Sequence, residues 1–183
     1  SLAIDRELGN QVGVARTLSN VGNVHYDRGD FARALEVHRE ALATERELGE
    51  KAEISGTLNN IGIALYRLGD FEGALDHLLE SLARDERAGR LNSAAGSAAN
   101  IGNIFAKLDQ LDRAEEYYRK GLELHTQVGN LDSMAGGYLS LGNLARRREH
   151  YDEALELYDR ALELGRRIES PAAQADALDN IGS

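Results

Sequence analysis

The chain has 183 residues, of which 42% are apolar and 28% charged, with one Pro and a formal net charge of −10. It contains no Cys, which excludes disulfides, thiol catalysis and thiolate metal sites, and its negative charge argues against a generic nucleic-acid or anionic-membrane binder. No apolar run approaches the roughly 18 residues that span a bilayer, and the opening "SLAIDRELGN" lacks a signal-peptide pattern.

The first ten residues belong to a unit that recurs along the chain. Leu2 and Leu8 fall in register with later leucines, so we expect residues 1–10 to end a preceding repeat. Laying residues 10–49 over 50–89 gives fourteen identities, and the same frame continues without an insertion. A period of this length is typical of a solenoid. The predicted full repeats are 11–50, 51–90, 91–130 and 131–170, within one array that covers 1–183.

Each repeat is predicted to hold two helices joined by a short turn. In the second repeat the apolar residues recur with a helical period, which predicts a first helix that buries Ile54, Leu58, Ile61, Leu65 and Leu68. The turn that follows has Gly69, suited to a left-handed helix end, and Asp70, suited to capping the next helix. The second helix closes near Gly89. Strand patterns are absent from the sequence, so we expect an all-α fold.

A Gly recurs on each first helix and an Ala on each second helix. The glycines are Gly22, Gly62, Gly102 and Gly142, and the alanines are Ala34, Ala74, Ala114 and Ala154. A Gly inside a helix costs about 1 kcal/mol of helix propensity. We therefore expect the two helices of a repeat to pack closely at these positions, which offsets that loss.

These residues give the chain a resemblance to a known family. Their pattern repeats in register and resembles the tetratricopeptide repeat. In the first repeat it consists of Leu18, Val21, Gly22, Tyr26, Gly29, Phe31, Ala34, Ala41 and Leu42. Its 40-residue period is like that of the longer repeats in Pins-type scaffolds and many bacterial signalling proteins. The resemblance implies a right-handed superhelical solenoid of antiparallel helix pairs that acts in protein interactions. The fourth repeat departs from the pattern at its turns, where it has Glu149, His150 and Glu169.

Residues 171–183 are predicted to form a truncated first helix, with Ser170 as its N-cap and Pro171 at its first position. Neither end of the sequence carries a polar capping helix. We therefore expect apolar end faces that allow head-to-tail self-association.

Amide side chains recur on the first helices at positions that point away from the apolar stripe. In the family that this chain resembles, first helices line a concave groove, so the expected peptide contacts are Asn20, Asn23, Asn60, Asn100, Asn103 and Asn143. An amide offers two donors and an acceptor, which suits the main chain of an extended ligand. The alternative is structural, with these side chains bonding to a neighbouring helix.

Charged residues flank this row of amides. They are Arg16, Asp27, Arg67, Lys107, Arg146 and Arg147, five positive charges against one negative. A basic stripe on an acidic protein predicts an acidic ligand, because charge complementarity sets register and association rate. Solvated and screened side chains are the alternative. Tyr26 and Tyr66 occupy equivalent positions on the groove side of their first helices. Two roles are open for them, contact with a ligand and packing in the core. A chaperone-type carboxylate clamp is not expected, because Ser19, Asn59 and Ala99 occupy the column where such members carry Lys.

The sequence therefore predicts a scaffold that binds an extended or short helical, acidic peptide in its concave groove. The alternatives are a regulatory or sensor segment of a larger bacterial signalling protein and a self-associating structural spacer. The sequence has no nucleophile and base pair, metal-ligand spacing or phosphate loop, so we expect no enzyme activity, metal or cofactor. We expect a cytoplasmic protein with a protein or peptide partner, and neither nucleic acid nor membrane as a partner.

Overall fold

The computed structural model describes residues 9–49 and 51–182. Its nine helices in this part of the chain are α2 (Gln11–Asp27), α3 (Phe31–Leu48), α4 (Lys51–Leu68), α5 (Phe71–Arg87), α6 (Leu91–Lys107), α7 (Leu111–Val128), α8 (Leu131–Arg147), α9 (Tyr151–Arg167) and α10 (Pro171–Ile181). These described residues contain no strand, and the predicted all-α fold is confirmed. The prediction that a preceding repeat ends in the first ten residues falls mostly on residues 1–8, which lie outside the described residues.

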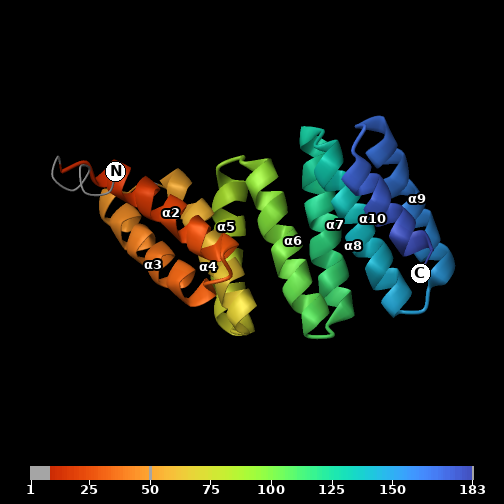
Figure 1. The fold of residues 1–183 in the computed structure, drawn as a ribbon, viewed down its shortest axis with the longest axis horizontal. Helices are drawn as coiled ribbons and strands as arrows, with labels where there is room; N and C mark the ends of the chain where they lie inside the picture. Colours follow the sequence, from red (N-terminus) through yellow and green to blue (C-terminus); the bar gives the residue numbers. More distant parts are fainter. Residues whose placement is uncertain (1–8, 50, 183) are drawn as a thin grey trace. The chain divides into compact units, whose positions relative to one another are not determined.

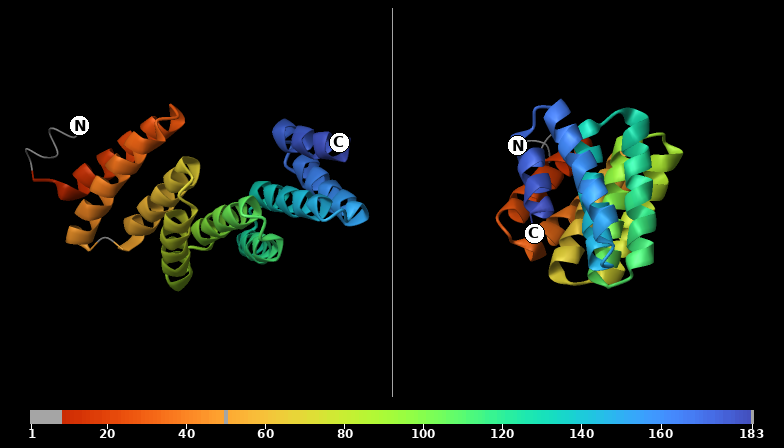
Figure 2. Two further views of the ribbon diagram at one scale, coloured as in Figure 1. Left: turned by 90° about the horizontal axis from the view of Figure 1, so that it is seen from below. Right: turned by 90° about the vertical axis from the view of Figure 1, so that its right-hand side faces the viewer.

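The helices form pairs joined by short turns, and one pair falls in each predicted repeat (Figure 1). Helix α2 packs on α3, α4 on α5, α6 on α7 and α8 on α9, as two further views show (Figure 2). The contacts divide the chain into two compact units, residues 1–89 and residues 90–183. In the first unit α3 also packs on α4, and in the second α7 packs on α8 and α10 on α9 and α8. A single array over the whole chain remains a prediction.

The turn within a repeat combines a left-handed residue with a helix cap. Gly29 and Gly69 have φ values of 79° and 86°, a conformation that Gly adopts without steric penalty. Asp30 and Asp70 follow as N-caps, and the Asp70 carboxylate accepts a hydrogen bond from the backbone N–H of Gly73 at 3.0 Å. This bond satisfies one of the free N–H groups at the start of the helix. The predicted turn chemistry is therefore confirmed.

The later repeats keep the same turn without Gly. Asp109 and Glu149 occupy the Gly29 column with φ values of 59° and 63°, and Glu169 has a φ of 52° at the end of α9. Ser170 then caps α10 through its hydroxyl, with Pro171 in the first turn, as predicted. The departures of the fourth repeat thus change residue type but not backbone conformation, and the side chains at positive φ are strained there.

The apolar stripe of α4 is buried as predicted except at its end. Ile54, Leu58, Ile61 and Leu65 are all at most 5% exposed, whereas Leu68 is 47% exposed. Leu68 is the last residue of the helix, where the chain turns away toward α5.

Each repeated Gly admits a large side chain from the second helix of its own repeat. Gly22 faces His38, Gly62 faces Leu78, Gly102 faces Tyr118 and Gly142 faces Tyr158. A Cβ at any of the four would lie 2.5 or 2.6 Å from the nearest side-chain atom, well inside the normal contact distance. The glycines therefore allow close helix packing, but what they accommodate is chiefly a bulky side chain rather than the recurring Ala.

Candidate functional site

The amides predicted to bind peptide lie on first helices, and in the first unit two of them join each other. Asn60 Nδ2 on α4 donates to Asn23 Oδ1 on α2 at 3.1 Å. Asn23 is exposed and Asn60 half-buried, so the pair lies at the surface between successive first helices. The structural role that the sequence left open is therefore present for these two residues. Peptide binding by the same amides remains a prediction.

In the second unit the equivalent amides bond within their own repeat. The hydroxyl of Tyr118 donates to Asn103 Oδ1 at 2.7 Å, and that of Tyr158 donates to Asn143 Oδ1 at 2.9 Å. Burial raises the pKa of Tyr158, and the positive charge of Arg146 opposes this only in part. The phenol thus remains protonated as a donor at neutral pH. These two Asn oxygens hold the second helix against the first.

Two of the predicted ligand-binding cations, Arg67 and Arg147, are exposed but also contact the neighbouring repeat. The Arg67 guanidinium carbon lies 4.4 Å from the Phe31 ring centroid, and its Nη1 donates to the Tyr26 hydroxyl at 3.4 Å. Arg147 donates to a carbonyl oxygen at the end of α6 at 2.6 Å and to Asp109 at 2.8 Å. A cation at a helix C-terminus is favourable because of the helix dipole. These contacts join successive repeats within a unit.

The other predicted site residues remain on the surface. Arg16, Asn20, Lys107 and Arg146 are exposed, and Asn100 is half-buried. The structure brings Asn23, Asn60, Tyr26 and Arg67 together in the first unit. The grouping of first-unit with second-unit residues into one groove remains a prediction.

The two groove-side tyrosines are half-buried and pack across the turn of their own repeat. The Tyr26 ring lies 5.2 Å from that of Phe31 in an edge-to-face arrangement, and the Tyr66 ring lies 5.8 Å from that of Phe71. Both contacts are in the range of favourable aromatic pairs. The two rings therefore have a packing role.

A pocket of about 290 Å³ lies between α2 and α4 in the first unit, with α3 contributing one residue. Its lining residues are Asn23, Tyr26, Asp27, His38, Asn60 and Ile63. Three of the predicted peptide contacts, Asn23, Tyr26 and Asn60, thus share one concavity. His38, which the sequence did not indicate, is 1% exposed, and burial lowers its pKa, so the imidazole is neutral at pH 7.

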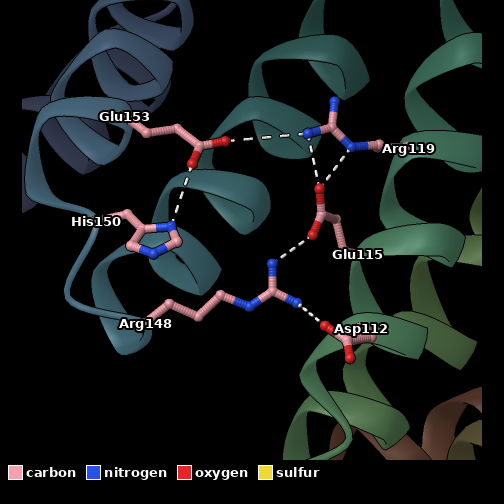
Figure 3. A network of polar contacts seen from close by, with 6 residues as sticks. All are labelled: Asp112, Glu115, Arg119, Arg148, His150 and Glu153. Atoms are coloured by element: carbon pink, nitrogen blue, oxygen red, sulfur yellow. Dashed lines mark hydrogen bonds and ion pairs between the residues drawn. The ribbon is translucent and has the colours of Figure 1, made fainter.

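An ion-pair network that the sequence did not predict joins the third and fourth repeats (Figure 3). Arg148 pairs with Asp112 and Glu115, Arg119 pairs with Glu115 and Glu153, and His150 lies 3.6 Å from Glu153. The hydrogen bond from Arg148, with help from Arg119, outweighs desolvation and lowers the pKa of Glu115. The carboxylate is therefore held ionised between two guanidinium groups.

The signal for this network was present in the repeat columns. Glu115 stands where the other repeats have Leu35, Leu75 and Leu155, whereas the positions equivalent to Arg148 hold Arg28, Leu68 and Leu108. An acid at an otherwise apolar position indicates a partner of opposite charge, because an ionised group seldom replaces an apolar one without a partner.

A buried polar contact between the first two repeats was also missed. Thr57 Oγ1 on α4 donates to Glu45 Oε1 on α3 at 2.7 Å, and Ser19 Oγ lies 3.4 Å from the same hydroxyl. Glu45 is only 1% exposed. The contact fixes the second helix of one repeat on the first helix of the next.

Residues 9–49 and 51–182 lack two features that other functions would require. Within these ranges, no helix combines the length and apolarity that crossing a membrane requires. The same ranges hold no group of three or more His, Asp or Glu residues arranged to bind a metal ion.

Comparison with known proteins identifies the family of the chain and solved structures with a similar fold. The tetratricopeptide repeat profile matches residues 13–87, 53–127 and 93–165. No curated protein sequence matches the chain. The crystal structure of BtubC (BKLC) from P. vanneervenii superposes with a TM-score of 0.86 at 23% identity, covering 100% of this chain and 78% of that one.

Two further structures superpose well. Aspartyl phosphate phosphatase F from Bacillus subtilis gives a TM-score of 0.87 at 13% identity, covering 91% of this chain and 44% of that one. A Rap protein in complex with Competence and Sporulation Factor gives 0.84 at 20% identity, covering 91% and 46%. At such identities the likeness concerns the fold alone. The chain spans less than half the length of these two proteins.

Proposed function

This chain belongs to the tetratricopeptide repeat family, and we propose that its first helices bind an extended or short helical segment of a partner protein. The observation that carries the proposal is the pocket of about 290 Å³, where side chains of two successive first helices surround one space. Amide groups at its rim can satisfy a peptide main chain as donors and acceptors. The similar Rap protein was crystallised with a factor bound, which supports a binding role for this fold.

The partner segment is proposed to be acidic where it meets the second unit. Lys107 and Arg146 are exposed on α6 and α8, and Arg147, one residue further along α8, is also exposed although it pairs with Asp109. In a chain of net charge −10, such a local group of cations would steer an acidic segment toward one face. The protein is further proposed to act without catalysis and in the cytoplasm, with which the absence of Cys is compatible.

A peptide display library panned against the whole chain tests this function. We expect enrichment of acidic peptides, with binding lost on addition of salt as charge screening increases. Recovery of basic peptides alone, or of none, would contradict the proposal.

The enriched peptide then tests the amides directly. Replacing Asn60 and Asn100 by Ala should weaken its binding at least tenfold while thermal unfolding shifts by only a few degrees, because an exposed hydrogen bond contributes about 1 kcal/mol. Gln127→Ala on α7, exposed and on a second helix, is the matched control and should bind as the unaltered chain does. Unaltered binding in the double variant, or collapse of folding, would assign the amides a structural role only.

A further inference from the structure

Two repeat positions that face each other hold a different pair of residues in the first repeat than in the others. The residue after the repeated Gly and the residue fifteen positions later form matched pairs, which are Asn23 with His38, Ile63 with Leu78, Asn103 with Tyr118 and Asn143 with Tyr158. In the third and fourth repeats a phenol donates to the amide oxygen. The second repeat replaces both members by apolar residues. Only the first repeat retains the Asn and replaces the Tyr by a shorter ring.

The imidazole of His38 occupies the start of the space that a Tyr side chain fills elsewhere. A Cβ at Gly22 would lie 2.5 to 2.7 Å from the His38 ring atoms, just as one at Gly102 would lie 2.6 and 2.7 Å from the nearest Tyr118 ring atoms. The rings therefore lie on equivalent glycines. An imidazole lacks the outer carbon and hydroxyl of a phenol, and both His38 and Asn23 line the pocket.

The pocket walls present acceptors for a hydrogen-bond donor. Asn23 Oδ1 receives one bond from Asn60 and, as a carbonyl-type oxygen, has a second lone pair. His38 Nδ1 is buried, and no hydrogen-bond partner for it is found within the described residues. Asp27 adds a carboxylate at the rim and Ile63 an apolar wall.

We propose that this pocket binds the phenol side chain of a tyrosine from the partner segment, with its hydroxyl at Asn23 and its ring beside His38 and Ile63. The proposal rests on the function proposed above and names one anchor of the ligand. The molecule itself shows the chemistry twice, in Tyr118 on Asn103 and Tyr158 on Asn143. The volume lies at the lower end of ligand pockets, which suits a single side chain. A ring with a polar tip is also typical of residues that anchor interfaces.

The test uses the tyrosine side chain as a free molecule. p-Cresol is titrated into the isotopically labelled whole chain, and the side-chain amide signals of Asn23 and Asn60 are followed by nuclear magnetic resonance. Toluene, which lacks the hydroxyl, and butylammonium, which mimics lysine, are titrated in parallel. We expect saturable shifts with p-cresol, at least tenfold weaker binding of toluene, and no saturable binding of butylammonium.

The variant His38→Tyr fills the pocket from within. Its phenol is expected to bond to Asn23 as in the later repeats, and p-cresol binding should fall at least tenfold. Should this variant fail to fold, Asn23→Ile, which copies Ile63 of the second repeat, removes the acceptor and should abolish the preference for p-cresol over toluene. Equal p-cresol binding in the unaltered chain and in a folded variant, or preferential binding of butylammonium, would overturn the proposal.

The outcome separates this proposal from the function on which it rests. If acidic peptides bind the chain and p-cresol does not, the tyrosine anchor is wrong and the peptide-binding function stands. If p-cresol binds and no peptide does, the pocket exists and the peptide-binding function is wrong.

Discussion

The substitution Gly142→Ala tests how the repeats are packed. An added Cβ would lie 2.5 and 2.7 Å from two carbon atoms of the Tyr158 ring, whereas carbon atoms normally approach to about 3.5 to 4.0 Å. The ring would therefore have to move by about 1 Å. Tyr158 is 1% exposed and packs against Ala154, so little space is available for that movement.

The expected change combines three contributions. Forced overpacking costs about 1 to 3 kcal/mol, and displacement of the ring weakens the 2.9 Å hydrogen bond from Tyr158 to Asn143, which is worth about 1 kcal/mol. The better helix propensity of Ala returns about 1 kcal/mol. The net loss in the free energy of unfolding is therefore about 1 to 3 kcal/mol, measurable by urea denaturation followed by circular dichroism.

Gly136→Ala in the same helix is the matched control. A Cβ at Gly136 meets no described atom within 4 Å, so only the propensity gain of up to about 1 kcal/mol applies. The two variants should therefore change stability in opposite directions. If Gly142→Ala stabilises the protein as much as Gly136→Ala does, the close contact between the repeated glycine and the ring does not exist.

Three further predictions follow from strain and charge. Glu149→Gly should raise the melting temperature by about 1 to 3 °C, because Gly removes the left-handed penalty at a φ of 63°, and a lower melting temperature would contradict this. Arg148→Ala should destabilise the protein by about 1 kcal/mol at pH 7. Because the pKa of Glu115 is lowered in the folded state, the destabilisation should be full above the unfolded pKa of about 4.5 and should vanish as the pH falls through the lower folded pKa. Urea denaturation at several pH values from 7 downward checks this, and a destabilisation that stays constant down to acid unfolding would refute it. Burial lowers the pKa values of His38 and His125 below 6.5, so below that pH the unfolded chain binds more protons than the folded one. The free energy of unfolding should therefore fall as the pH drops below 6.5. A free energy of unfolding that stays constant between pH 7 and 5 would count against the burial of these two side chains.

Features set by local chemistry could be predicted from the sequence. The left-handed Gly69 and the Asp70 cap depend on a few adjacent residues, so the sequence placed the turn correctly. The period of 40 likewise placed each helix pair, because insertions are absent between repeats. Family membership followed from the same register.

Side-chain partners were harder to predict because they depend on residues from different helices. Asn103 and Asn143 carry the same amide as Asn23, yet they accept from a phenol fifteen positions later. The direction in which an amide points is decided by what faces it, which helical periodicity alone does not specify. Comparing equivalent positions in pairs would have identified these Asn and Tyr partners.

The location of the bound segment tests the central claim most directly. An enriched peptide carrying a benzophenone side chain is bound to the whole chain and irradiated, and the crosslinked residues are identified by mass spectrometry. Binding along the first helices predicts crosslinks to α2, α4, α6 and α8. Crosslinks confined to α3, α5, α7 and α9 would contradict the proposed binding face.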